Sequence, residues 1–381
     1  DADDNTVVGY SALSADTLGD ASTAIGKFAL ANQNFTTATS ALNTAVGHSA
    51  GAAVTTGTVN TLLGAEAGES LTVGHHNTSV GIRSMENNVN GSNSVAIGSF
   101  ALQDQTFATA TDGNNVAVGY AAGANITSGI SNTIIGSQAG DALTDADFNV
   151  AIGLGSLGAD TRGSKSVAVG TACLKAQNFT TATDTYNTAV GHNAGNDVTT
   201  GIRNTLIGGL SGDAITEGNY NVGVGYQTLT SDVLGTGNTA VGYSALRDQS
   251  FSTATNSYNT GFGYQAGTAI TTGVQNTLIG GSAGDALTTG GENVVVGYNA
   301  LHSDTKGVGS VAIGRNALYY QNFSTTTTSY NTAIGKSAGL YVTTGVENTL
   351  IGGLAGDALT TGGYNVAIGS HALKSDDLGS H

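Results

Sequence analysis

Short stretches of alternating Thr or Val and larger apolar residues recur along the chain, and each stretch ends in glycine. Asn187–Gly191 (NTAVG) shows the pattern, which returns twenty-one times between Asn5 and Gly369. Counted from the glycine, position −1 is Val, Ile, Leu or Phe, and position −3 is Thr or Val. Because side chains alternate along a strand, these two positions share one face. The pattern predicts a short β-strand in each copy, with positions −1 and −3 directed into a core. One such inward file is expected at Val118, Ile135, Ile152, Val169 and Val190.

The spacing of the glycines is as regular as the motif. Three gaps of 17 residues are followed by one of 21, which gives a 72-residue period, and Gly9 to Gly369 spans five periods. Self-similarity of this kind is typical of solenoids. We therefore predict an all-β fold, a parallel β-solenoid (β-roll) of about 21 coils in a four-coil super-repeat. Residues 1–381 form one repetitive domain, expected to be a segment of a longer fibre or filament because both ends fall at the same phase of the period.

Two further positions of the motif carry predictions. Position −4 is Asn in seventeen copies and Ser in four, and such side chains are expected to form hydrogen bonds along the stack or to the turn backbone. Position −2 is mostly Ala, so the second face of the strand is expected to be thin. Large apolar residues replace Ala there once per period, which predicts a subunit interface; the alternative is that they pack under a loop of their own chain. These residues are Leu62, Ile134, Leu206, Leu278 and Leu350.

Composition narrows the class of protein. There are 58 Gly and no Pro, charged residues make up 10%, and the net charge is −16. The negative net charge argues against a nucleic-acid partner. The sequence contains no run of 18 apolar residues, which a membrane span would need. The single Cys173 occupies a position that other coils fill with Ala, Ser or Thr, so it is expected to be a small core residue.

Candidate chemistry is sparse. Acidic residues recur once per period, and a calcium ion needs 6–8 oxygen ligands. Successive copies would lie ~19 Å apart, so they cannot share an ion. We expect these residues to lie in solvated turns, and a calcium site at an individual turn remains the alternative. These residues are Glu69, Asp141, Asp213, Asp285 and Asp357. The seven histidines show no metal-ligand spacing. We predict no catalytic residue, no cofactor and no metal site, and hence no enzyme.

The segment Ser94–Ala101 (SVAIGSFA) resembles the repeat of trimeric autotransporter adhesin heads. The longer segment Asn331–Gly369, which contains T-T-G turns, is similar to the repeat shafts of phage tail fibres and bacterial tail-fibre-domain proteins. This resemblance implies a left-handed β-roll that assembles as a homotrimer outside the cell, on a cell-surface appendage, or on a virion tail fibre. Coils of 17 and 21 residues are longer than the adhesin-head repeat.

Together these features favour a non-enzymatic extracellular fibre or filament shaft that presents or supports adhesion, with end-to-end stacking of copies. The alternative is an adhesin head that binds a host or matrix ligand, a surface glycan or a protein receptor, through its lateral face. A shaft should repeat the same surface in each period, whereas a receptor site should break the repeat. The clearest breaks are Met85–Asn88 and Tyr319–Tyr320.

Overall fold

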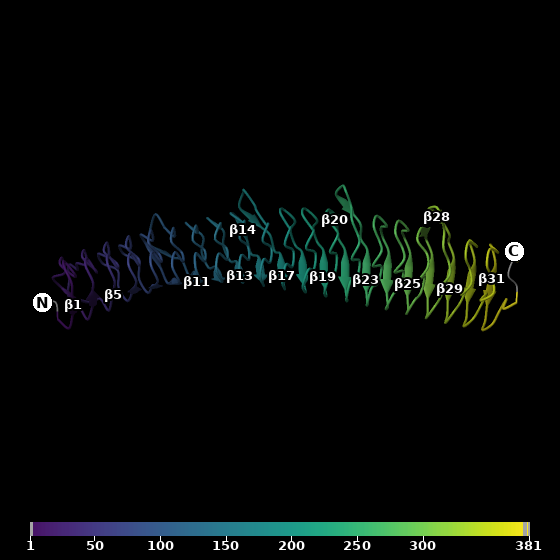
Figure 1. Ribbon diagram of the computed structural model, residues 1–381, viewed down its shortest axis with the longest axis horizontal. Coiled ribbons are helices and arrows are strands. Elements are labelled where there is room, and N and C mark those ends of the chain that lie inside the picture. Colours follow the sequence, from purple (N-terminus) through teal and green to yellow (C-terminus); the bar gives the residue numbers. More distant parts are fainter. Residues whose placement is uncertain (1–2, 376–378, 380–381) are drawn as a thin grey trace. The chain divides into compact units, whose positions relative to one another are not determined.

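The computed structural model, which describes residues 3–375 and 379, confirms the parallel β-solenoid of about 21 turns (Figure 1). The described residues contain strands and turns but no helix, and so none that could cross a membrane. The chain divides into two compact units, Asp1–Asn187 and Thr188–His381. Each unit is a stack of coils.

In the first unit every coil contributes one three-residue strand to a parallel sheet. These strands are β1 (Thr6–Val8), β3 (Thr23–Ile25), β5 (Thr44–Val46), β6 (Thr61–Leu63), β7 (Thr78–Val80), β9 (Val95–Ile97), β11 (Val116–Val118), β12 (Thr133–Ile135), β13 (Val150–Ile152) and β15 (Val167–Val169). Two-residue strands pair where a long coil meets the preceding one: β2 (Gly19–Asp20) with β4 (Thr39–Ser40), β8 (Gly91–Ser92) with β10 (Thr111–Asp112), and β14 (Gly163–Ser164) with β16 (Thr183–Asp184). The long coils therefore form separate two-stranded sheets with the coils that precede them.

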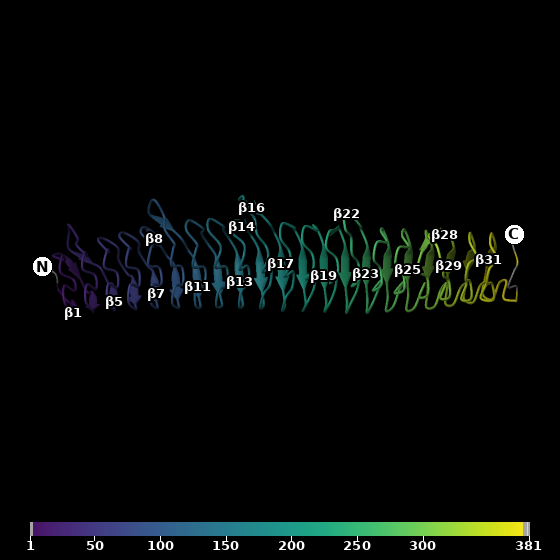
Figure 2. The ribbon, with the colours of Figure 1, turned by 45° about the horizontal axis from the view of Figure 1, so that its top comes forward.

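The second unit repeats this arrangement. Its three-residue strands are β17 (Thr188–Val190), β18 (Thr205–Ile207), β19 (Val222–Val224), β21 (Thr239–Val241), β23 (Thr260–Phe262), β24 (Thr277–Ile279), β25 (Val294–Val296), β27 (Val311–Ile313), β29 (Thr332–Ile334), β30 (Thr349–Ile351) and β31 (Val366–Ile368). The two-residue pairs are β20 (Gly235–Thr236) with β22 (Thr255–Asn256), and β26 (Gly307–Val308) with β28 (Thr327–Thr328). Within each unit the loops near the two-residue strands project away from the row of three-residue strands (Figure 2).

The strands face the opposite way from the prediction. In β12 the middle residue, Ile134, is fully buried, whereas Ile135 at position −1 is 38% exposed. The expected inward file, which also includes Ile152, lies on the outside of the coil, where Ile135 is exposed and the other members are partly exposed. Alternation correctly groups the residues that share a face, but the coil interior is too narrow for a bulky residue at every position −1. Ala at position −2 fits that space.

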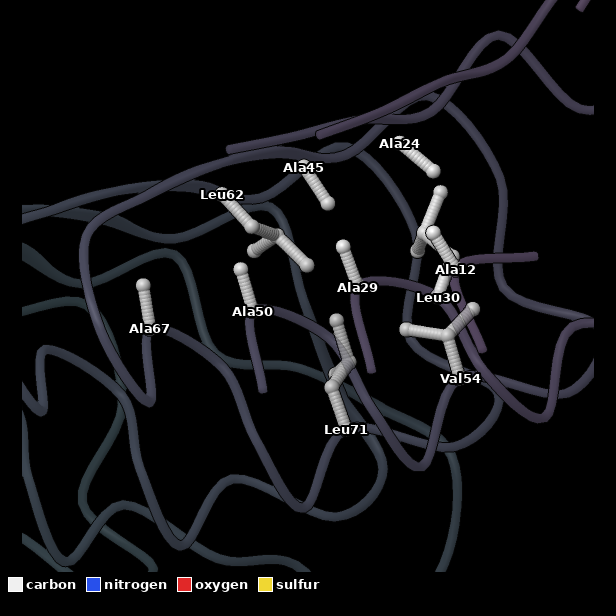
Figure 3. Packing of buried hydrophobic residues seen from close by; sticks show 10 residues of the cluster. All are labelled: Ala12, Ala24, Ala29, Leu30, Ala45, Ala50, Val54, Leu62, Ala67 and Leu71. Carbon is white, nitrogen blue, oxygen red and sulfur yellow. The ribbon is translucent and has the colours of Figure 1, made fainter. Parts of the chain in front are cut away.

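On the turn side of the interior, each coil places a large apolar side chain at one of two positions. Where position +4 is Leu, as at Leu30, position +7 is polar; where position +4 is Gly, as at Gly51, position +7 is aliphatic, as at Val54. Figure 3 shows Leu30 and Val54 below the row that contains Ala24, Ala45 and Leu62. Cys173 is buried, as predicted. The core is therefore thin and depends on small residues.

Stacked asparagines hold consecutive coils in register, as expected from position −4. The backbone N–H of Asn60 donates to Asn43 Oδ1 at 2.9 Å, and Asn60 Nδ2 donates to the carbonyl of Gly74 at 2.9 Å. The same pattern links Asn276 to Asn259 in the second unit. These side chains are fully or almost fully buried, so the repeated bonds satisfy polar groups that would otherwise destabilise the core.

The turns depend on residues in the left-handed region. Gly136 has a φ of 135°, and a Cβ there would lie 2.6 Å from the carbonyl oxygen of Gly153 in the next coil. Only glycine fits this close approach. Non-glycine residues also adopt positive φ in almost every coil, for example Leu30 (50°) and the β-branched Val59 (59°). Hydrogen bonds between coils, such as Leu30 N–H to Ala50 O at 3.0 Å, hold these residues in place.

Candidate functional surfaces

The outer sheet face consists of the first and third residues of the three-residue strands. By sequence it carries only Thr, Val, Ile, Leu and Phe. Its apolar side chains are substantially exposed in both units, as at Leu63 (45%) in the first and Phe262 (55%) in the second. Because one apolar residue recurs in every coil, the outer sheet face is a continuous apolar strip within each unit. Its apolar side chains are exposed in some coils and partly exposed in the others.

The predicted interface residues do not lie on this surface. The side chains of Leu62, Ile134, Leu206, Leu278 and Leu350 are all fully buried. They fill space left by glycines at position +4: a Cβ on Gly212 would lie 2.7 Å from Leu206 Cδ2. The interface prediction was wrong for these five residues, because position −2 points into the coil. The coincidence of Leu at −2 with Gly at +4 is the sequence signal for this packing.

Several coils carry a shallow hollow beside the turn, lined mainly by positions +1, +2, +5 and +6; we call this surface the turn groove. In the first unit it includes a hollow lined by Ser11, Phe28 and Glu69 among others, and a second hollow lined by Gln138, Asp141 and Lys175. In the second unit a corresponding hollow lies at Tyr319. The turn groove therefore contains hollows in both units.

The recurring acidic residues occupy position +5, beside this groove. Burial raises the pKa of Asp141, and it raises that of Asp213 to about 6. Asp285 Oδ1 lies 2.6 Å from His302 Nδ1. Glu69 belongs to the one cluster of three potential metal ligands among the described residues, with Glu66 and Glu86.

Arg83 already occupies the neighbourhood of this cluster. Its Nε lies 2.6 Å from Glu66 Oε2 and 3.8 Å from Glu86 Oε1. The guanidinium thus offsets part of the negative charge that would attract a cation. The cluster and Arg83 thus form a partly exposed ion-pair network.

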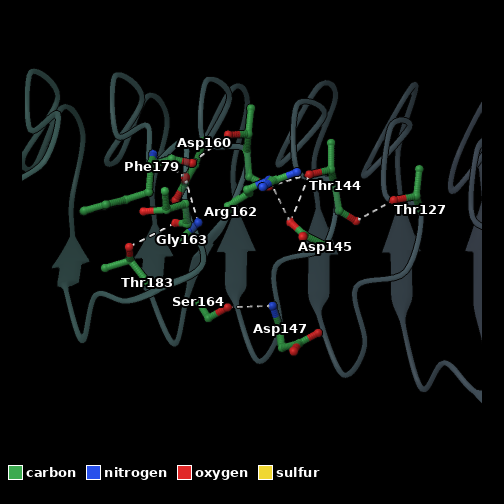
Figure 4. Close-up of polar contacts among 12 residues, drawn as sticks. Thr127, Thr144, Asp145, Asp147, Asp160, Arg162, Gly163, Ser164, Phe179 and Thr183 are labelled. Atoms are coloured by element: carbon green, nitrogen blue, oxygen red, sulfur yellow. Dashed lines mark hydrogen bonds and ion pairs between the residues drawn. The ribbon is translucent and has the colours of Figure 1, made fainter.

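A buried carboxylate network, not foreseen from the sequence, recurs at position +7. Asp160 Oδ1 accepts hydrogen bonds from the backbone N–H groups of Gly163 (3.0 Å) and Phe179 (3.2 Å), and Asp160 Oδ2 accepts one from Gln177 Nε2 at 2.5 Å (Figure 4). Gln177 Nε2 also donates to Ser166 Oγ at 2.9 Å. Despite these donors, burial raises the pKa of Asp160.

Equivalent Asp–Gln pairs occur at Asp16–Gln33, Asp232–Gln249 and Asp304–Gln321. In the second period the acid is replaced by Asn88, whose Oδ1 accepts from the Gly91 N–H as the carboxylates do. A neutral side chain therefore serves the same structural role. The signal in the sequence was the polar residue at +7 wherever +4 is Leu or Met.

No family model matches this sequence, and no curated protein is significantly similar to it. The surfaces described above must therefore carry the functional argument.

Proposed function

We propose that this protein is a non-enzymatic, extracellular structural fibre or filament shaft, of the tail-fibre type, whose copies associate laterally as a homotrimer. The observation that carries the proposal is the outer sheet face, an apolar strip that recurs in every coil and whose side chains are exposed or partly exposed. Exposed apolar patches of this extent are typical of protein interfaces. The trimer and the extracellular location follow the resemblance to tail-fibre and adhesin-head repeats.

A second copy of the chain fits this strip better than an unrelated partner. Copies of one chain share the same coil spacing, so an apolar side chain of one copy can meet its equivalent from another at every level of the stack. The strip carries no charged residue that would have to be desolvated on association. Three copies with their outer sheet faces toward a common axis would remove all three strips from water.

Polar substitutions on the outer sheet face test the association. We expect the parent protein to have three times the mass of one chain by light scattering, and the triple variant Ile207→Asn, Phe262→Asn, Ile279→Asn to dissociate while its circular dichroism remains β-rich. A matched control replaces three other exposed apolar side chains of the second unit, Tyr226, Tyr243 and Tyr264, by Asn. This variant should keep the parent mass. A monomeric parent, or a variant with unchanged mass, would refute the interface.

The adhesin-head alternative depends on a surface that breaks the repeat. In the first irregularity Met85 and Asn88 are buried, whereas Asn87 is exposed. In the second, Tyr320 is exposed beside a hollow of the turn groove. The second irregularity therefore combines an exposed side chain with a concave surface.

A further inference from the structure

The turn groove of the second unit becomes aromatic at the coils that follow Gly297, Gly314 and Gly335. A hollow of about 300 Å³ is bordered there by Tyr298, Tyr319, Tyr320 and Tyr341, together with Arg315 and Asn316. Three of these rings are exposed: Tyr298 by 59%, Tyr320 by 45% and Tyr341 by 50%. Concave sites that combine aromatic side chains with a few polar groups are the usual form of a ligand site.

The aromatic rings are arranged as a preformed wall. Tyr320 and Tyr341, on consecutive coils, have ring centroids 5.4 Å apart and planes 7° apart, and Tyr319 packs edge-on against Tyr320 at 4.7 Å. A second hollow of about 560 Å³, bordered by Thr343 and Thr360, lies against the same two rings. Tyr320 and Tyr341 thus contribute to two adjacent hollows. Because neighbouring rings already contact one another, less side-chain freedom remains to be lost on binding.

Arg315 borders the hollow, and Lys336 holds the equivalent position one coil further along. Arg315 and Lys336 occupy position +1 of consecutive coils, both are exposed, and neither forms an ion pair with another described residue. The chain has only 11 Lys and Arg residues and a net charge of −16, so two neighbouring cations without an acidic partner are unusual for this sequence. Their placement favours an anionic group on the ligand.

The polar groups favour a sugar over a peptide. Asn316 borders the hollow, and its Oδ1 is buried with no hydrogen-bond partner among the described residues. The backbone is already engaged: Asn316 N–H donates to Tyr298 O at 3.1 Å, and Tyr320 N–H donates to Leu340 O at 3.2 Å. An extended peptide therefore finds no open strand edge to which it could add.

We propose that this part of the turn groove binds an acidic oligosaccharide, with pyranose rings against Tyr298, Tyr320 and Tyr341 and a carboxylate at Arg315 and Lys336. Consecutive coils are spaced by ~4.8 Å, so side chains of one type recur along the groove with a spacing comparable to the advance of a linear pyranose chain per sugar. Asp357 lies at position +5 one coil beyond Leu340 and restricts the anionic part of the ligand to the Arg315–Lys336 side. The site lies outside the outer sheet face and does not depend on the proposed self-association.

Calorimetric titration of the full chain with two acidic probes, a galacturonate hexasaccharide and a hyaluronan hexasaccharide, tests the proposal against neutral cellohexaose and a hexaglutamate peptide. We expect at least one acidic sugar to bind, more tightly than either comparison ligand. Tyr320→Ala/Tyr341→Ala and Arg315→Ala/Lys336→Ala should each weaken that binding by about tenfold or more. The control Tyr243→Ala/Tyr264→Ala removes another stacked pair of the same unit, with centroids 5.3 Å apart, and should leave affinity unchanged.

Unaltered circular dichroism of the three variants would establish that loss of binding is not loss of fold. Absence of binding by both acidic sugars, equal loss in the control variant, or equally tight binding of cellohexaose would overturn the assignment. Tight binding of hexaglutamate through the same residues would replace it with an acidic-peptide site.

Discussion

Replacing Ile134 by Asp is expected to lower the free energy of unfolding by ~4 kcal/mol or more, whereas replacing its neighbour Ile135 by Asp should cost the single chain less than ~1 kcal/mol. Ile134 is fully buried between alanines of the adjacent strands, so an Asp there places an unpaired charge in the core. Ile135 lies on the outer sheet face, where a carboxylate remains hydrated.

This pair of substitutions separates the two orientations of the strand directly. Denaturant unfolding, with the concentration of protein varied to separate folding from association, gives both free energies. If Ile135→Asp proved the more harmful change at a concentration where the chains are dissociated, positions −1 and −3 would be the core. The same result would remove the basis of the proposed shaft interface.

The second large effect is a dependence of stability on pH that runs opposite to ordinary acid denaturation. Burial raises the pKa of Asp232 from 3.8 to about 6, and it also raises the pKa of Asp160 and Asp304. Below about pH 4 the carboxyl is protonated in both the folded and the unfolded chain, so no penalty arises. As pH rises toward 6 the unfolded chain releases the proton first, and the folded state loses stability until its own carboxyl ionises. For Asp232 a shift of about two units corresponds to a loss of about 3 kcal/mol.

Asn88 shows how to remove this dependence. Because an amide already occupies the equivalent position in the second period, Asp232→Asn should keep the Gly235 N–H hydrogen bond and flatten the pH profile between 4 and 7. Asp112 is exposed, so Asp112→Asn changes the net charge equally and serves as the control. Thermal midpoints measured across this range decide the matter. A parent that grows more stable from pH 4 to 7, or a profile that Asp232→Asn leaves unchanged, would contradict the buried ionisation.

The architecture could be predicted from sequence because its determinants are strictly periodic. The glycines gave the coil length, and the Asn at position −4 gave the polar stack, since both act through the backbone of the adjacent coil. The orientation of Ile134 and Ile135 could not be obtained in this way. Alternation states which residues share a face, whereas the choice of inner face depends on the volume inside the coil.

The space inside the coil is filled by positions +4 and +7 together, and only the structure shows that these two positions share it. Leu30 accompanies Gln33, and Gly51 accompanies Val54, so the core alternates between two fillings. The buried Asp160 follows from the first filling, because a Leu at +4 displaces the aliphatic residue from +7. The pair Tyr319–Tyr320 is visible in the sequence as a break of the repeat. The hollow beside it, and the position of Arg315 at its border, follow only from the fold of the turn.

The left-handed residues of the turns also bear on how the chain acquires its structure. Leu30 and Val59 each hold a conformation that costs ~1 kcal/mol or more in isolation, and the bonds that offset this cost come from the adjacent coil. A solitary coil is thus unfavourable, while a coil added to an existing one is templated by it. Folding should therefore resemble the growth of a one-dimensional crystal, with a slow nucleus followed by rapid elongation. Refolding followed by far-ultraviolet circular dichroism should begin with a lag, and a single exponential from the first instant would show that each coil forms without a template.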